Sequence, residues 1–129
     1  MKKLSRLGTA LLLLPGIVFA QEPCRTRTTV EINQCARQAL ERKDQELNSA
    51  YQTLMKSLES EGKPNAVDYA GTRKLLQQAQ RAWVQFRDDD CRAKYMLNAN
   101  GTVRELAALG CQIEHTEHRT KQLKEWLKA

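Results

Sequence analysis

The feature that most limits how this chain folds is a series of apolar stripes at helical spacing, separated by few breaks. Beyond residue 20, the candidate breaks are residues 61–65, residues 98–101 and Gly110. Glycine or proline at such places ends helices or forms turns. The alternation that is typical of strands does not persist anywhere in this part of the sequence. We therefore expect a chain built from helices alone.

The first helix is expected over residues 29–60. Thr28 and Glu31 have the spacing of a capping box, in which each side chain bonds the backbone N–H of the other residue. Apolar residues then recur in steps of three, four or seven, at Ile32, Ala36, Leu40, Leu47, Tyr51, Leu54 and Leu58. Because a helix of this length needs a partner to cover its stripe, the pattern predicts a helical hairpin.

Two further helices complete the expected fold. The second has its stripe at Leu75, Leu76, Ala79, Trp83, Phe86, Met96 and Leu97, and Gly101 stops it. Thr102 and Glu105 repeat the capping-box spacing and predict the start of the third helix, which bends or splits at Gly110. Its stripe is Val103, Leu106, Ile113, Thr116, Leu123 and Leu127. The sequence thus predicts an all-α fold, a long antiparallel hairpin with a third, C-terminal helix packed on it.

The first twenty residues have the three parts of a secretory signal peptide. Lys2, Lys3 and Arg6 form a basic region, an apolar run follows, and small residues precede an expected cleavage after Ala20. The apolar run is too short to cross a bilayer, which takes about 20 residues. We expect a single domain over residues 21–129 that is periplasmic or secreted and has no membrane span after cleavage.

The charge balance argues against a nucleic-acid partner. The whole chain has a formal net charge of +6, but three of its basic residues belong to the predicted signal peptide. Nucleic-acid-binding domains usually gather basic residues on one face, and the small remaining excess gives no such footprint. We expect a protein partner instead, and the sequence leaves the oligomeric state open.

Four cysteines follow the predicted signal peptide. An even number in an exported chain predicts two disulfides, which would staple the helices together. Folding the chain back at its breaks brings the last three cysteines to about the same level, with the first just before the first helix. Two pairings therefore fit, either Cys24–Cys35 with Cys91–Cys111, or Cys35–Cys91 with Cys24–Cys111.

No group of residues indicates an enzyme or a bound cofactor. The sequence has no recognisable nucleophile motif and no glycine-rich phosphate loop, and cysteines in disulfides are not nucleophiles. His115 and His118 are the best metal candidates because residues three apart can share a helix face. Zinc-protease helices use a different spacing, so a solvated polar face is the favoured interpretation. The run 88–90 is read in the same way, because three successive helical aspartates point about 100° apart.

Asp44 and Asn48 are unusual because they are polar and lie beside the apolar stripe of the first helix. Polar groups near a buried stripe need partners, and Arg87 or Arg119 could supply them. The favoured interpretation is a structural polar lock between helices. The alternative is a ligand or partner site built on the same residues.

Taken together, these motifs resemble a known family. The segments that carry the likeness are Cys35-Ala36, Asp44-x-x-Leu47-Asn48-x-x-Tyr51, Leu76-x-x-x-Gln80-x-x-Trp83-x-x-Phe86-Arg87-Asp88-x-x-Cys91 and Cys111 followed by Thr116-x-x-Arg119-x-x-x-Leu123. In this order and spacing the chain resembles the lysozyme inhibitor LprI-like domain of exported and lipid-anchored bacterial proteins. The resemblance covers roughly residues 24–126. It implies a helical envelope protein able to inhibit lysozyme. The matched positions look first like fold determinants.

Loop position and charge, rather than the resemblance, suggest where inhibition would come from. The cleft of lysozyme holds a pair of catalytic carboxylates, which a basic side chain on a protruding loop could plug. The candidate loops are residues 61–65 and 98–102, with Lys63 or Arg104 as the probe. An alternative function is a periplasmic structural or chaperone-like module, in which the long amphipathic hairpin lends an apolar groove to a partner helix.

Overall fold

The first helix begins where the capping box predicts. The computed structural model describes residues 28–59 and 66–128, and in it α1 spans Thr29–Ser57. Thr28 Oγ1 accepts a hydrogen bond from the Glu31 N–H, and Glu31 Oε2 accepts one from the Thr28 N–H. This cap is confirmed. The helix ends at Ser57 rather than at residue 60, which lies outside the described residues.

The second helix, α2, spans Tyr69–Leu97. Asp68 caps its start, because the Asp68 carboxylate accepts a hydrogen bond of 2.8 Å from the Gly71 N–H. At the other end the Asn98 side-chain amide donates to the Lys94 carbonyl, which also accepts a hydrogen bond from the Asn98 backbone N–H. The helix stops at Leu97, four residues before Gly101, and gives way to a short turn.

The third helix, α3, spans Arg104–Glu125 and continues as a 3₁₀ turn, η1, over Trp126–Lys128. The capping box predicted at Thr102 is wrong: Val103 is the N-cap, and no side chain caps the helix. The Glu105 carboxylate instead accepts a hydrogen bond from Asn33 and pairs with Arg37, both on α1. A contact between helices has replaced the local one. The helix runs through Gly110 without interruption.

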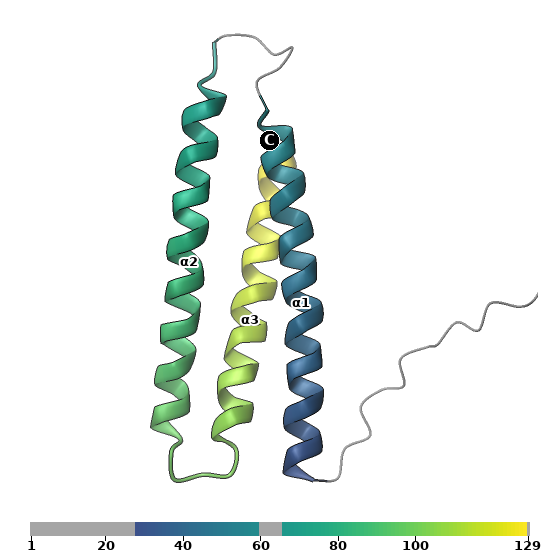
Figure 1. Ribbon diagram of the computed structural model, residues 1–129, viewed down its shortest axis with the longest axis vertical. Coiled ribbons are helices and arrows are strands. Elements are labelled where there is room, and N and C mark those ends of the chain that lie inside the picture. The colour runs from purple at the N-terminus through teal and green to yellow at the C-terminus, as the bar shows by residue number, and fades with distance from the viewer. Residues whose placement is uncertain (1–27, 60–65, 129) are drawn as a thin grey trace, which may run out of the picture.

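The three helices form an elongated bundle in which α3 is central (Figure 1). α1 and α3 run in the same direction, and α2 runs antiparallel to both. α3 packs along both neighbours, whereas the backbones of α1 and α2 approach each other at few points. The all-helical prediction is confirmed. The predicted arrangement is only partly right, because the third helix lies between the arms of the hairpin rather than on a closed pair.

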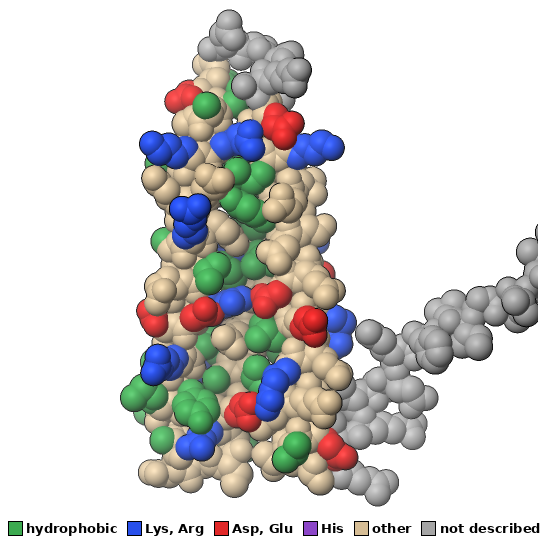
Figure 2. Space-filling model, viewed as in Figure 1, with side chains coloured by type: hydrophobic (Ala, Val, Ile, Leu, Met, Phe, Trp, Pro, Cys, Tyr) green, Lys and Arg blue, Asp and Glu red, His purple; other side chains and the backbone are tan. Residues whose placement is uncertain are grey.

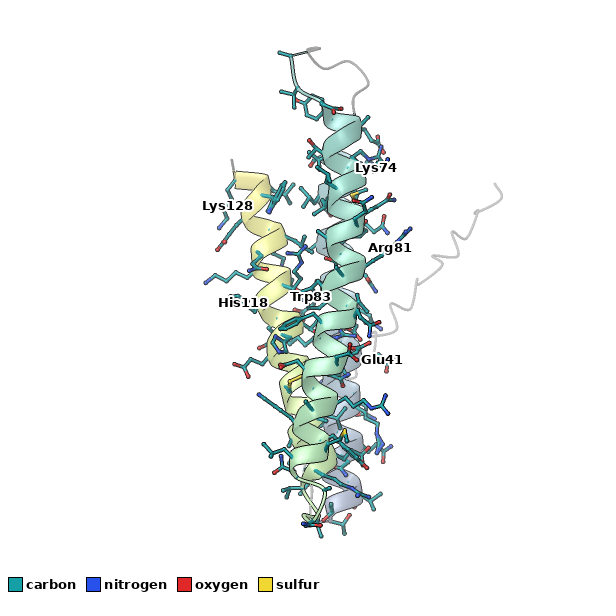
Figure 3. The ribbon with its side chains drawn as sticks, turned by 90° about the vertical axis from the view of Figure 1, so that its left-hand side faces the viewer. Glu41, Lys74, Arg81, Trp83, His118 and Lys128 are labelled. Carbon is teal, nitrogen blue, oxygen red and sulfur yellow. A yellow bond between two sulfur atoms is a disulfide. The ribbon has the colours of Figure 1, made fainter. Side chains whose placement is uncertain are left out.

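The apolar core occupies the half of the bundle that holds the end of α1 and the start of α2. Its buried members are Leu47, Ala50, Leu54, Met55, Leu76 and Leu123, with Tyr51, Leu58 and Trp83 partly buried against them. Trp83 extends from α2 toward α3 (Figure 3). Burial of such side chains from water stabilises the fold by about 25 cal/mol per Å² of apolar surface. This core fixes the register of the three helices in the rest of the molecule.

Much of the apolar stripe predicted for α2 is not buried. Leu75, Phe86, Met96 and Leu97 are all more than half exposed. The reason is that α2 packs mainly against α3, so only a narrow side of it is covered, where Leu76 and Cys91 are buried. Hydrophobic side chains are visible along the face between α2 and α1, and charged side chains cross that face about halfway (Figure 2).

A disulfide between Cys91 and Cys111 joins α2 to α3. It excludes the cross-linked pairing, in which Cys91 would join Cys35. Cys35 is also disulfide-bonded, and Cys24 lies outside the described residues, so the first bridge of the local pairing stays a prediction. Segment 1–20, the predicted signal peptide, also lies outside them. Among the helices the structure describes, none has the length and apolar character needed to span a membrane.

Candidate functional site

Halfway along the bundle, a single guanidinium connects all three helices. Arg87 on α2 donates from Nη1 to Asp44 Oδ1 on α1 at 2.7 Å and to Thr116 Oγ1 on α3 at 3.1 Å. Its Nε donates to Asp88, and its guanidinium carbon lies 5.3 Å from the ring centre of Trp83. The Arg87 side chain is only 12% exposed. A buried guanidinium needs this many partners, and the arrangement has the form of an interhelical lock.

Thr116 on α3 is the third member of this group. We call Asp44, Arg87 and Thr116 the polar layer. Thr116 is fully buried, and its hydroxyl accepts the Arg87 bond while it donates to the Gln112 carbonyl one turn earlier. Thr120 repeats the pattern by donating to the Thr116 carbonyl. Both threonines therefore satisfy their hydroxyl groups inside the bundle. The polar groups of the layer thus bond one another or the backbone.

Arg119 and Gln80 form a second bridge between α2 and α3. Arg119 Nε donates to Gln80 Oε1 at 3.0 Å, and Nη1 donates to Gln122. Partial burial of the guanidinium lowers the pKa of Arg119 from its ordinary value. Asn48, by contrast, is exposed, and the structure gives it no hydrogen bond to either arginine. The expected Asp44–Asn48 pair is therefore split: Asp44 joins the layer and Asn48 faces solvent.

Four apolar or aromatic positions of the family motif, Leu47, Tyr51, Trp83 and Leu123, lie in or against the core. Leu47 and Leu123 are buried, with Leu123 fully so, and Tyr51 and Trp83 pack against the same cluster. These residues support the bundle from its more apolar half. None of the four contributes an exposed group to a site.

His115 and His118 do not form a pair. His118 is exposed, whereas His115 Nε2 lies 2.7 Å from Asp90 Oδ2 on α2. The three aspartates of residues 88–90 have separate partners, because Asp88 accepts from Arg87, Asp89 accepts from Gln85, and Asp90 contacts His115. His115 and Asp90 lie beside the disulfide, because the Asp90 Oδ2 atom that contacts His115 is also 3.8 Å from Cys111 Sγ.

The end of the bundle that carries the α2–α3 turn has a cleft of about 530 Å³, lined by Thr29, Asn33, Tyr95, Ala99, Asn100, Gly101, Thr102, Arg104 and Glu105. Arg104 stacks on Tyr95, with its guanidinium carbon 5.1 Å from the ring centre, and donates to the Ala99 carbonyl. Asn33 is 6% exposed, and its Oδ1 has no hydrogen-bond partner. The cleft thus combines an oriented cation with a free buried acceptor.

Exposed apolar side chains surround this cleft. Leu97 is 87% exposed at the end of α2, and Val103 is also more than half exposed beside Arg104. We call Tyr95, Leu97, Val103 and Arg104 the turn-end surface. Arginine and aromatic residues with apolar neighbours are the composition that dominates binding energy at protein interfaces. The second candidate probe, Lys63, lies outside the described residues.

Sequence reasoning missed Asn33 and Tyr95. Asn33 lies three residues before Ala36, in line with the stripe of α1, and it is buried as that position requires. A polar residue at a stripe position is therefore the signal that would have found it. Tyr95 gives no comparable signal, because its importance depends on the turn that brings Arg104 back over it.

Comparison with known proteins identifies the family to which the chain belongs. A family model described as lysozyme inhibitor LprI matches residues 21–123. An uncharacterized protein of Rhizobium meliloti (strain 1021) is 32% identical over 117 residues, which is 85% of this chain and 84% of that protein. The uncharacterized protein YecT of Escherichia coli (strain K12) is 32% identical over 106 residues, or 71% of this chain and 60% of YecT. No solved structure matches significantly. The chain belongs to the lysozyme inhibitor LprI family.

Proposed function

We propose that this protein is an exported inhibitor that binds lysozyme and blocks its cleft with the turn-end surface. The observation that carries the proposal is the family match over most of the chain. Because the relatives are uncharacterized, the mechanism must come from the chemistry of this chain. That chemistry favours binding over catalysis, since Cys91 and Cys111 are joined in a disulfide and the polar layer is internally paired.

Arg104 is the cation best placed to enter an acidic cleft. The lysozyme cleft holds two carboxylates, one of them ionised, and a guanidinium can bond a carboxylate through two N–H groups at once. Stacking on Tyr95 and the bond to Ala99 hold Arg104 in a defined orientation. Less side-chain freedom is then lost on binding, which favours affinity. Leu97 and Val103 supply apolar contact around it.

Net charge does not assist this encounter. Both lysozymes of the basic type and this chain carry positive net charge, so long-range attraction does not steer association. We therefore expect slow, salt-tolerant binding whose affinity comes from local contacts. Inhibition that vanished at moderate salt would contradict this mechanism.

The test is a turbidity assay of bacterial cell walls with several lysozyme types and the oxidised chain beginning at Gln21. We expect dose-dependent protection of the walls at stoichiometric concentrations. Arg104→Glu should raise the concentration needed at least tenfold, because it places a carboxylate against the catalytic pair. Arg81→Glu makes the same charge change on an exposed part of α2 about 21 Å along the helix from Tyr95, at 1.5 Å per residue, and should leave inhibition unchanged.

Lys63→Glu tests the connection between α1 and α2 in the same assay. If Lys63→Glu abolishes inhibition and Arg104→Glu does not, the inhibitory end is the α1–α2 connection, and the turn-end assignment is wrong. If both variants inhibit normally, the plug mechanism is wrong at both ends. A parent chain that protects against no lysozyme would remove the inhibitor function altogether.

Export is part of the same proposal. The family match begins at residue 21, directly after the predicted cleavage site, and disulfides form and persist in oxidising compartments outside the cytoplasm. Expression of the full chain in a bacterium should give a periplasmic or secreted protein that begins at Gln21. The mass of the recovered protein measures this directly. An uncleaved protein retained in the cytoplasm would contradict export.

A second candidate function rests on the exposed face of α2. Leu75, Phe86 and Leu97 are exposed and eleven residues apart, which is close to three helical turns, so they lie in line along the helix. Such a row can receive the apolar face of a partner helix. If this is the function, Leu75→Ser should abolish binding of an amphipathic helical peptide while lysozyme inhibition, if present, stays unchanged. A folded, oxidised chain that binds neither hydrophobic dye nor such peptides would exclude it.

A further inference from the structure

Four potential metal ligands meet across α2 and α3 at the disulfide. They are Asp90, Cys91, Cys111 and His115, and their ligand atoms all lie within 4.8 Å of one another. Cys111 and His115 are four residues apart on α3 and so share one face of that helix, while Asp90 and Cys91 are adjacent on α2. The disulfide itself requires only the two cysteines. The carboxylate and the imidazole beside it need a separate explanation.

We propose that reduction of the Cys91–Cys111 disulfide converts this cluster into a four-ligand zinc site. Two thiolates, one imidazole nitrogen and one carboxylate oxygen form a ligand set that suits tetrahedral Zn²⁺. His115 Nε2 and Asp90 Oδ2 are already 2.7 Å apart, and Asp90 Oδ2 lies 3.8 Å from Cys111 Sγ. The two non-sulfur ligands therefore need no large rearrangement to reach an ion that the sulfurs hold.

A dithiol can supply the electrons and protons that this conversion requires. The dithiol gives two electrons and two protons to the disulfide, so that Cys91 and Cys111 become thiols and the reductant becomes a disulfide. Zn²⁺ then binds the two sulfurs as thiolates and releases the two thiol protons to solvent. The metal replaces one link between α2 and α3 with another. The two helices thus remain tied together in either redox state.

Burial and access also fit a metal site. The sulfurs are almost fully buried, whereas the side chains of His115 and Asp90 are 28% and 42% exposed, which leaves an entry path from solvent. The Phe86 ring meets the His115 ring edge-on with centroids 5.3 Å apart. Such a contact restrains the orientation of the imidazole, as outer-shell residues do in metal sites.

The decisive experiment compares zinc binding by the oxidised and reduced forms of one chain. Replacing Cys24 and Cys35 with serine removes the other two thiols. The chain is reduced with a phosphine and titrated with Zn²⁺ against a chromophoric chelator. We expect one Zn²⁺ per reduced chain and none per oxidised chain. His115→Ala should weaken zinc binding at least tenfold, and His118→Ala, a histidine one turn away and exposed, should not change it.

Helical content, measured by circular dichroism in the same samples, separates binding from unfolding. If the reduced chain loses helix and recovers it when zinc is added, zinc has taken over the role of the disulfide, and the proposal stands. If the serine variant does not fold when oxidised, the parent chain is reduced and titrated with Co²⁺. A thiolate charge-transfer band that His115→Ala alters and His118→Ala does not would support the site. Equal metal uptake by oxidised and reduced chains, or by the His115→Ala chain and its parent, would overturn it.

Discussion

At the scale of single residues, Arg87 links all three helices, because its guanidinium bonds α1 and α3 from α2. Arg87→Met leaves Asp44 without its ionic partner, and we expect the free energy of unfolding to fall by about 2 kcal/mol. Asp44 is 39% exposed, so water partly replaces the lost bond. Asp44→Asn keeps an acceptor for Arg87 and should cost about 1 kcal/mol. Urea denaturation of the oxidised chain measures both values, and an unchanged Arg87→Met midpoint would contradict the lock.

The same variants decide whether the polar layer is a lock or a binding site. If it is a lock, Asp44→Asn and Gln80→Ala reduce stability but inhibit lysozyme as the parent does at temperatures where they stay folded. Asn48→Ala should change neither property, because Asn48 is exposed and bonds neither arginine. Loss of inhibition without loss of stability in any of the three would move the site from the turn end to the middle of the bundle.

The sequence predicted that both Asp44 and Asn48 need partners on other helices. The structure shows that Asp44 has one and that Asn48 faces solvent. Both residues flank the same stripe, and a stripe does not tell which of its sides the neighbouring helix covers. Long side chains such as Arg87 reach across a helix interface, so their partners depend on the register that the core sets. Asn33 was not predicted, although it is a polar residue at a stripe position, and its bond to Glu105 depends on the fold.

At the scale of single helices, caps test how far local motifs decide where a helix begins. Thr28→Ala removes the acceptor for the Glu31 N–H, so we expect a loss of about 1 kcal/mol in unfolding free energy. Thr102→Ala is the matched control, because Thr102 does not cap α3, and should change it by less than about 0.5 kcal/mol. Thermal denaturation followed by circular dichroism compares the two. Equal losses would mean that Thr102 does cap α3.

The two capping motifs had the same spacing and only one forms a cap. The side chain of Glu31 bonds the Thr28 N–H and forms the cap. Glu105 meets Asn33 and Arg37 on α1, and these contacts replace the cap. Charged partners on a neighbouring helix are invisible to a motif that spans four residues. The exposed stripe of α2 has a similar origin, because periodicity predicts an apolar face but not whether a neighbour covers it.

At the scale of the whole molecule, the number of helices and their class followed from the sequence, whereas the central position of α3 did not. Three amphipathic helices with short connections can pack with any of them in the middle, because the apolar stripe of each helix can be buried against either of the other two. Side-chain shape at the interfaces makes the choice. In the resulting bundle α1 and α2 each pack mainly on α3, so the link between α2 and α3 matters for the stability of the whole fold.

That link is partly covalent, and its contribution can be measured. Cys91 and Cys111 are 20 residues apart. In the chain-entropy model, closing a loop of this size raises the free energy of the unfolded chain by about 3 kcal/mol. Cys91→Ala combined with Cys111→Ala should lower the unfolding free energy by about that amount in urea denaturation, without zinc present. Because α2 has few other neighbours, we expect hydrogen exchange to increase first along α2. Even protection of all three helices in the variant would show that α2 does not depend on the disulfide for its place in the bundle.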